Sequence, residues 1–151
     1  MKTTVKTSLG LVLLFVIVAA MGSITRRDSR PTSSNQSLRG LIPWRNDLTS
    51  ARQEALAAHK PLFVEFAADW CPDCHAMAAQ TWTQPSVAAA MQAYVPVLID
   101  PDAHPDLSQQ FNVVSIPSIF VIDPQSAKIT RESRDHVFSP EELLAWLNPA
   151  N

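Results

Sequence analysis

Apolar and polar positions change their spacing several times after about residue 41, and these changes predict a series of short elements. Helical spacing, good helix formers and start signals predict helices over 47–59, 72–80, 86–94, 106–111 and 139–147. Short, mostly apolar runs predict strands over 61–67, 95–99, 118–122 and 128–134. The order αβαβαββα, with the two consecutive helices counted together, predicts an α/β fold with a central mixed β-sheet flanked by helices.

The start of the chain is a candidate membrane segment. Lys2 and Lys6 precede an apolar run over 9–21, so residues 1–24 are predicted to be a membrane anchor. We expect this anchor to stay attached and the domain to lie outside the cytoplasm. The alternative is an export signal that is cleaved before Ser23.

Residues 25–41 are rich in Ser, Thr, Asn and Arg, and this composition predicts a flexible linker before a domain over 42–151. The three glycines of the chain all precede that domain, so its turns are expected to use Pro, Asp, Asn and Ser. The formal net charge of −2 gives no basic face to hold nucleic acid, and we expect no nucleic-acid partner.

The only two cysteines of the chain stand in the segment Trp70-Cys71-Pro72-Asp73-Cys74-His75. Two thiols at this spacing can close to a disulfide and reopen with little movement of the backbone. One sulfur can then attack a partner's disulfide, and the other can release the mixed disulfide. Because no further cysteine is present for structural disulfides, the pair is a redox centre, half of a metal site or a haem attachment point.

The pair is expected at the start of a helix that follows a buried strand. Cys71 falls at the helix N-terminus, where free N–H groups and the helix dipole stabilise a thiolate, so it is the predicted nucleophile. Cys74 lies one turn further along and is the predicted resolving thiol. Asp73 lies between the sulfurs and disfavours a thiolate, whereas a charged His75 favours one. The sequence therefore leaves the reduction potential open.

These motifs resemble a known family. A strand followed by ADWCxxC (68–74) at the start of a helix, and SIPS (115–118) before a later strand, is similar to a thioredoxin-fold domain. The segments ADWC (68–71) and TWTQPSV (81–87) most resemble the C-terminal domain of DsbD-type thiol:disulfide interchange proteins, which pass reducing equivalents in the bacterial periplasm. The resemblance implies exchange with protein thiols and disulfides, with no cofactor and no bound metal.

The resemblance also implies a substrate-binding surface. Ile116 and Pro117 match the family's cis-proline loop, which faces the disulfide, pairs with a substrate strand and keeps metal away from the thiolates. Trp70 is expected to form part of the apolar surface around the nucleophile, with Pro72 and Asp73 beside it. The other tryptophans are expected to be packing residues: Trp44, Trp82 and Trp146.

Glu65 is an acidic residue inside an apolar strand. Alternation places it on the same face as Phe63 and Ala67, so we expect it to be buried. A buried carboxyl group has a raised pKa and can exchange a proton with Cys74. The resemblance assigns this role to the matching acid, although the lysine that the family usually has on the next strand is absent from 94–98.

Other functions remain open for the same motif. CxxCH is also the attachment pattern of c-type haem, with His75 as an axial ligand. Cys71, Cys74 and His75, completed by His104 or His59, could instead hold copper or zinc in a metal-delivery module. A noncatalytic interaction domain is a further alternative, although such a domain does not need both thiols.

The combined expectation is a thiol:disulfide oxidoreductase tethered to the bacterial inner membrane by a single pass, with its domain in the periplasm. DsbD-like residues favour a reductant of protein disulfides that receives electrons from a separate membrane redox partner. The alternative is a disulfide-forming oxidant, because proline directly after the nucleophile, as in Cys71-Pro72, also occurs in strong oxidants.

Overall fold

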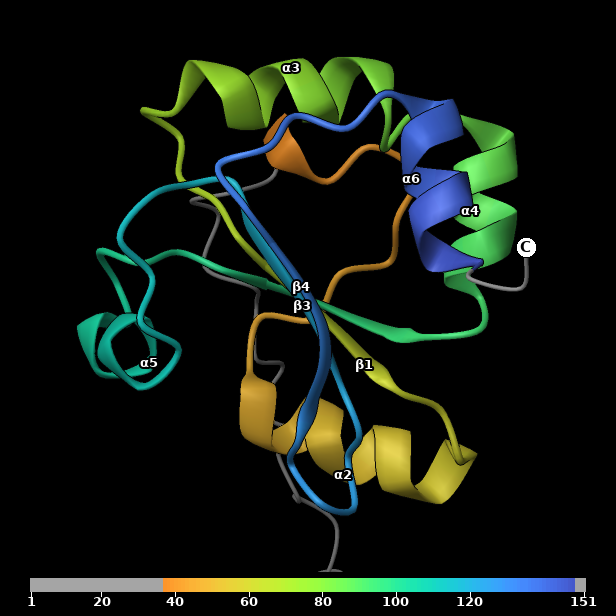
Figure 1. Ribbon diagram of the computed structural model, residues 1–151, viewed down its shortest axis with the longest axis vertical. Coiled ribbons are helices and arrows are strands. Elements are labelled where there is room, and N and C mark those ends of the chain that lie inside the picture. The colour runs from red at the N-terminus through yellow and green to blue at the C-terminus, as the bar shows by residue number, and fades with distance from the viewer. Residues whose placement is uncertain (1–36, 149–151) are drawn as a thin grey trace, which may run out of the picture. The chain divides into compact units, whose positions relative to one another are not determined.

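A four-stranded mixed sheet forms the centre of the computed structural model, which describes residues 37–148 (Figure 1). Its strands are β1 (Leu62–Phe66), β2 (Val95–Ile99), β3 (Ser118–Ile122) and β4 (Ile129–Arg134). They lie in the order β2-β1-β3-β4. β1 runs parallel to β2 and antiparallel to β3, and β3 pairs with β4 as an antiparallel hairpin. The mixed sheet predicted from the sequence is therefore confirmed.

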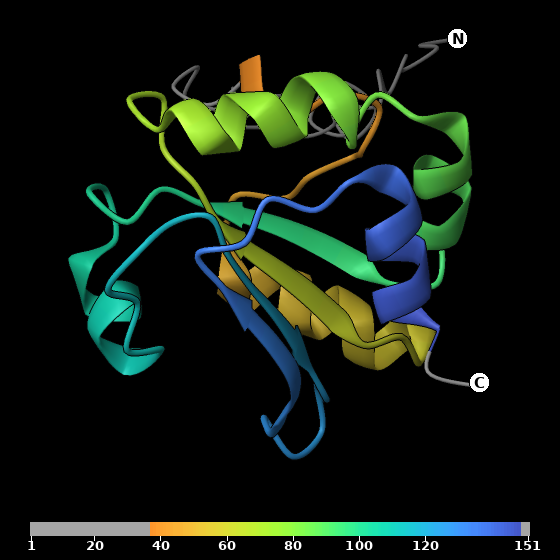
Figure 2. The same ribbon diagram turned by 45° about the horizontal axis from the view of Figure 1, so that its top comes forward.

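Helices cover both faces of this sheet (Figure 2). They are α2 (Leu48–Ala58), α3 (Pro72–Gln80), α4 (Pro85–Met91), α5 (Pro105–Gln110) and α6 (Pro140–Leu147). Residues of α3, α4 and α6 pack on one face, and residues of α2 pack on the other. Every predicted element is present, although the helix expected over 86–94 ends at Met91.

The two faces of β1 belong to different parts of the core. Phe63 and Ala67 pack in the cluster of α3, α4 and α6, whereas Val64 and Phe66 pack in the cluster of α2. All positions of β1 are buried because helices cover both faces of the sheet. Glu65 therefore lies on the α3 face, as alternation predicts.

The predicted anchor over 1–24 lies outside the described residues, as does the linker up to residue 36. Within residues 37–148, no helix combines the length and the apolar character that crossing a membrane requires.

The end of the expected linker is part of the folded domain. Residues 38–44, here called the strap, pack against the loop between α3 and α4. Leu38 is 1% exposed and belongs to the core. The backbone N–H of Leu41 donates to the carbonyl oxygen of Trp82 at 2.7 Å. The domain therefore begins before residue 42, and the polar composition of 25–41 concealed this.

Gly40 is required by the close approach of the strap to Trp82. Its φ is +53°, and a Cβ built on it would lie 2.4 Å from the carbonyl oxygen of Trp82.

We expect Gly40→Ala to lower the free energy of unfolding by at least about 2 kcal/mol, because it adds backbone strain to a steric clash. Urea unfolding of the full-length oxidised chain measures this. Leu41→Ala, which removes a largely exposed side chain, is the control, and equal stability of the two variants would contradict the prediction.

Four other described residues have a left-handed backbone: His59, Asn112, Ala127 and Asp135. Asn112 and Asp135 are of the types expected to replace glycine in these turns, because their short polar side chains tolerate this conformation. His59 and Ala127 were not expected; His59 ends α2 as its C-cap.

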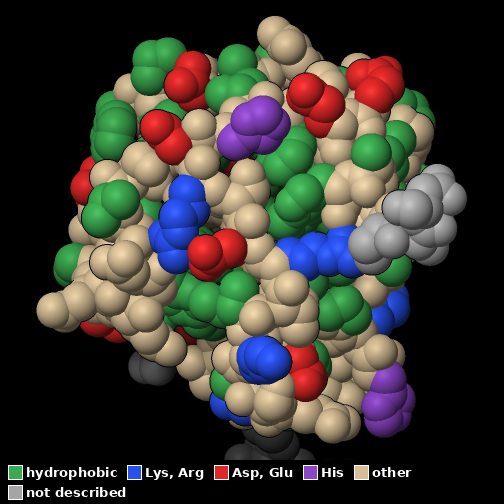
Figure 3. Space-filling view, in the orientation of Figure 1, with side chains coloured by type: hydrophobic (Ala, Val, Ile, Leu, Met, Phe, Trp, Pro, Cys, Tyr) green, Lys and Arg blue, Asp and Glu red, His purple; other side chains and the backbone are tan. Residues whose placement is uncertain are grey.

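Charges of both signs are mixed over the surface drawn in Figure 3. Among residues 37–148, two ion pairs lie on the exterior, one between Arg134 and Glu132 at 3.1 Å and one between Arg45 and Glu54. Exposed pairs of this kind each contribute about 1 kcal/mol or less. The stability of the fold therefore depends on the two apolar clusters of the core.

Candidate active site

The two cysteines form a disulfide at the N-terminal end of α3. Their Cα atoms are 5.3 Å apart. Cys71 is the N-cap residue of the helix, and Pro72 occupies the first turn, where its missing N–H removes no helical hydrogen bond. Cys74 follows one turn later. The sequence therefore folds locally as predicted, with both sulfurs where the chain passes from β1 to α3.

The backbone around Cys71 stabilises negative charge on its sulfur. The N–H of Cys74 points at Cys71 Sγ over 3.1 Å. The same sulfur lies at the positive end of the α3 dipole. When the pair is reduced, both effects favour the thiolate, which is the attacking form. Cys71 and Cys74 are 3% and 1% exposed in the disulfide form, so both residues are buried.

Asp73 and His75 lie outside the immediate surroundings of the sulfurs. Asp73 is exposed, so water and salt screen its effect on a thiolate. His75 is half-buried, and its Nε2 lies 2.7 Å from the carbonyl oxygen of Asp69. This contact joins the first turn of α3 to the segment that precedes the cysteines.

The loop before β3 faces Cys71. The peptide bond between Ile116 and Pro117 is cis, as the resemblance implied. Cys71 Sγ lies 3.8 Å from the carbonyl oxygen of Ile116. The hydroxyl of Ser118 donates to the carbonyl of Ser115 at 2.8 Å, which fixes the loop at its far end. The structure thus brings the predicted loop and the predicted nucleophile together.

Glu65 is buried on the α3 side of the sheet, with 1% of its surface exposed. Burial raises its pKa to about 8, and a hydrogen bond from the indole of Trp82 partly opposes that rise. The Trp82 Nε1 to Glu65 Oε1 distance is 3.4 Å, and Oε2 has no hydrogen-bond partner in the described part of the chain. The predicted burial is confirmed. The contact of Trp82 with Glu65 was missed, since the sequence pattern indicates only a packing residue.

An apolar surface surrounds the cysteines on the side of Trp70. Trp70 is 64% exposed and Val114 is 84% exposed. Trp70 Nε1 donates to Asp102 Oδ2 at 2.6 Å, which fixes the indole ring across a shallow hollow of about 180 Å³. The hollow is lined by Trp70, Pro101, Asp102, Val113, Val114, Ser115 and Ile116. Sequence reasoning missed Asp102 and Val114, which lie in loops without a distinctive motif.

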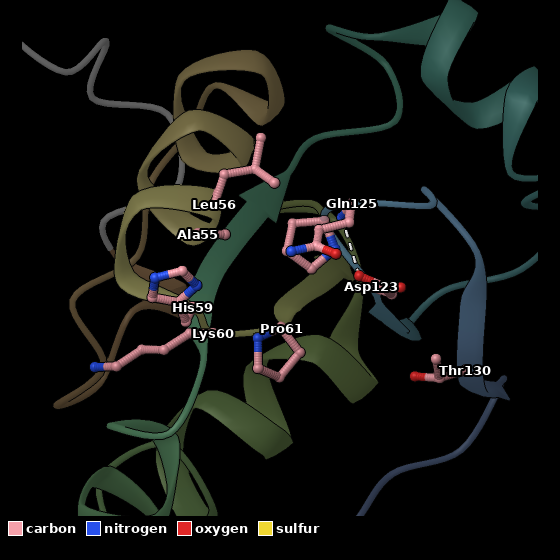
Figure 4. Close-up of a pocket in the computed structure, with 9 residues that line it drawn as sticks. Ala55, Leu56, His59, Lys60, Pro61, Asp123, Gln125 and Thr130 are labelled. Carbon is pink, nitrogen blue, oxygen red and sulfur yellow. Dashed lines mark hydrogen bonds between the residues drawn. The ribbon is translucent and has the colours of Figure 1, made fainter.

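The candidate metal ligands are not brought together. Over residues 37–148, no three His, Cys, Asp or Glu side chains cluster in a way that could hold a metal ion. His104 is the N-cap of α5. His59 lines a cavity of about 280 Å³ with Lys60 and Asp123, beyond the start of β1 and so at the opposite end of that strand from the cysteines (Figure 4). The described residues therefore do not support the metal site considered from the sequence.

Comparison with known proteins decides the family. The thioredoxin-like family matches residues 43–124, a range that includes β1, both cysteines and the cis-proline loop. The chain belongs to the thioredoxin-like family. Its fold is accordingly the thioredoxin-like α/β fold predicted from the sequence, and the Cys71–Cys74 disulfide lies within the matched range. This result favours thiol exchange over haem attachment.

Relatives of this thioredoxin-like chain include the thiol:disulfide interchange protein DsbD of Neisseria meningitidis serogroup B. It is 35% identical over 81 residues, which are 50% of this chain and 14% of that protein. Thioredoxin-2 of Pyricularia oryzae is 29% identical over 107 residues, which are 68% of this chain and 55% of that protein. The chain thus spans a small part of the first relative and about half of the second.

Solved structures give the same result. The oxidised C-terminal domain of N. meningitidis DsbD superposes with a TM-score of 0.58 at 28% identity, covering 68% of this chain and 95% of that domain. A thioredoxin from Thermus thermophilus gives a TM-score of 0.63 at 20% identity, covering 70% of this chain and 84% of that one, and supports the fold alone. The resemblance to DsbD C-terminal domains is therefore confirmed.

Proposed function

We propose that this thioredoxin-like protein is a membrane-tethered reductant of protein disulfides that acts outside the cytoplasm. The observation that carries the proposal is the Cys71–Cys74 disulfide at the N-terminus of α3, opposite the carbonyl of Ile116. The predicted nucleophilic sulfur, the predicted resolving sulfur and the cis-proline loop lie beside one another. This arrangement suits attack on a disulfide in another polypeptide.

The reaction follows from the two sulfurs. The thiolate of Cys71 attacks one sulfur of the substrate disulfide, the substrate S–S bond breaks, and the leaving sulfur takes the electron pair. Cys74 then loses its proton and attacks Cys71 Sγ, which releases the second substrate sulfur as a thiolate. The substrate gains two electrons and takes up two protons, and the Cys71–Cys74 pair loses two electrons as its disulfide forms.

Glu65 is the proposed acceptor of the Cys74 proton. It is the one charged residue that is buried in the described range, and it shares the α3 face of β1 with Ala67. Burial raises the pKa of Glu65 to about 8, toward the value of about 8.5 for an ordinary thiol, so a thiol transfers its proton to Glu65 at a lower free-energy cost than to an ordinary carboxylate. No lysine on β2 is needed for this transfer.

The surface beside the cysteines favours a polypeptide substrate. Trp70 and Val114 both expose apolar surface and both line the hollow next to the cis-proline loop. The hollow has a volume of about 180 Å³, which is smaller than the roughly 300 Å³ of the smallest typical binding sites for small molecules. An extended segment that crosses the apolar rim brings its disulfide to Cys71.

The reductant direction is supported by the likeness to DsbD domains. Each turnover leaves the pair oxidised, so a donor must return two electrons before the next turnover. We therefore include a separate membrane redox partner as the donor. The specific observation that favours the reverse, oxidising direction is Pro72 directly after Cys71, at the first turn of α3.

The tether and the location complete the proposal. The apolar run over 9–21, flanked by Lys2 and Lys6, supports an anchor in the bacterial inner membrane. The domain then lies in the periplasm, or becomes soluble there if the segment is cleaved before Ser23.

The reduction potential of the pair tests the proposed direction. The full-length chain is equilibrated with glutathione buffers, and the fraction of Cys71–Cys74 disulfide is measured after acid quenching and thiol alkylation. A potential near that of thioredoxin, about −270 mV, is expected for a reductant. A potential near that of DsbA, about −120 mV, would make the protein an oxidant. The Cys71→Ser chain is the control, since it cannot form the disulfide.

A further inference from the structure

Trp82 is a buried residue outside the cysteine motif that contacts the carboxyl group of Glu65. It lies between α3 and α4, and none of its surface is exposed. Its indole N–H donates to Glu65 Oε1 at 3.4 Å. The second oxygen, Oε2, is also buried and has no hydrogen-bond partner within residues 37–148. The two carboxyl oxygens therefore lie in different surroundings.

We infer that Trp82 is a positioning residue, whose N–H occupies Oε1 of Glu65 and so makes Oε2 the atom that accepts and returns the proton. The inference rests on the proposed function, in which Glu65 takes the proton of Cys74. An indole nitrogen is a donor only, so it holds Oε1 as an acceptor whether or not the carboxyl group is ionised. When Cys74 ionises, its proton bonds to Oε2, and Oε1 keeps its hydrogen bond.

The strap holds Trp82 in place for this contact. The backbone carbonyl of Trp82 accepts a hydrogen bond from the N–H of Leu41 at 2.7 Å. The ring of Trp44 meets the Trp82 ring edge-on, with centroids 5.3 Å apart, and Phe63 does so at 5.9 Å. Trp44 is fixed in turn, because its indole N–H donates to the Arg39 carbonyl and the Arg39 guanidinium donates to the Trp44 carbonyl. The side chain that contacts Glu65 is thus held by backbone and ring contacts.

The hydrogen bond from Trp82 is the main polar interaction that acts on the pKa of Glu65. The elements packed around Glu65 place no charged side chain beside its carboxyl group. β2, β3 and α4 contain no charged residue, and β4 is separated from β1 by β3. α2 packs on the opposite face, and the two acidic residues of α6 are exposed. On α3, Asp73 is exposed and the ring of His75 contacts the Asp69 carbonyl. The other titratable groups packed on this face are half-buried Tyr94, whose ring meets that of Phe63, and the two cysteines, when reduced.

Trp82→Phe removes the donor and keeps an aromatic ring. In the full-length oxidised chain, ¹³C NMR of the five glutamate carboxyl groups follows Glu65 as a function of pH. We expect the titration midpoint of Glu65 to rise by roughly one pH unit, because the ionised carboxyl group loses its hydrogen bond. Trp146→Phe, the same change on α6, is the control and should leave the midpoint where it is. An unchanged midpoint in Trp82→Phe would overturn the inference.

A kinetic readout links the contact to exchange. In the reduced chain, we expect the pH profile for resolution of the mixed disulfide to move to higher pH in Trp82→Phe. In a Glu65→Gln background, Trp82→Phe should leave that profile unchanged. If Trp82→Phe moves the profile equally in both backgrounds, Trp82 acts by a route other than Glu65 and the inference fails.

A measurement on the unmodified chain tests the contact even if the Trp82→Phe variant does not fold. The indole ¹⁵N–¹H signal of Trp82 should shift with the same midpoint as the Glu65 carboxyl group, and an indole signal that ignores this titration contradicts the contact. These outcomes also separate the two proposals. Coupled titration in a chain that exchanges no disulfide overturns the proposed function alone, whereas exchange without coupled titration overturns the role of Trp82 alone.

Discussion

Replacing Cys71 by serine is expected to lower the rate of disulfide exchange by several orders of magnitude, to the uncatalysed level. A serine hydroxyl is not ionised near neutral pH, so it cannot use the N–H of Cys74 and the α3 dipole as the thiolate does. Reduction of a disulfide-bonded protein such as insulin by the pre-reduced full-length chain measures the loss.

Cys74→Ser is the matched partner of this experiment. Both variants lose the same short disulfide loop, so any effect of that loop on stability is shared. Only Cys74→Ser keeps the nucleophile, and we expect it to accumulate a mixed disulfide with the substrate that is visible on non-reducing gels. Exchange that survives Cys71→Ser, or mixed disulfides that form equally in both variants, would show that Cys71 is not the attacking sulfur.

The free energy of unfolding of the oxidised chain is expected to fall as the pH rises from about 5 to about 8. Burial raises the pKa of folded Glu65 to about 8, whereas in the unfolded chain it returns to its ordinary value near 4.5. Between these values the folded state holds a proton that the unfolded state has lost, so stability decreases with pH by up to about 1.4 kcal/mol per unit. Above the folded pKa both states are ionised, and the contribution of Glu65 no longer changes.

Glu65→Gln isolates this contribution, because glutamine keeps the shape of the side chain and does not titrate. The difference in unfolding free energy between the two chains, from urea unfolding at several pH values, should favour the variant increasingly up to about pH 8. The disulfide form is used so that neither cysteine titrates. Parallel pH curves for the two chains would mean that Glu65 keeps an ordinary pKa in the fold.

A buried acid that destabilises the fold near neutral pH calls for a functional reason. The same burial brings the pKa of Glu65 close to that of a thiol, which is the property that proton exchange with Cys74 requires. The pH dependence of stability and the proposed chemistry therefore have one physical origin.

Much of the fold could be predicted from local patterns. β1 and β3 are short apolar runs bounded by polar or turn residues, and the cysteine motif stands where such a strand gives way to good helix formers. Ser139 and Glu142 form the capping box that their spacing indicates. These features depend on residues within a few positions of one another, so the sequence carries them directly. The burial of Glu65 follows from the same alternation.

The strap could not be predicted in this way. Leu38 is a single apolar residue among polar neighbours, and the requirement for glycine at position 40 comes from the backbone of Trp82. A contact between segments so distant in the sequence leaves no periodic signal. The hydrogen-bond partner of Glu65 could not be predicted for the same reason, because the sequence indicates only that Trp82 is an aromatic core residue.

The sequence by itself determined the element order, the two sulfurs at the start of a helix and an acid within the strand before it, because each depends on local spacing. Tertiary structure alone decided that Asp102 fixes Trp70 and that the indole of Trp82 meets one oxygen of Glu65. These contacts join residues far apart in the chain, and their geometry is fixed only when the sheet and its helices pack together.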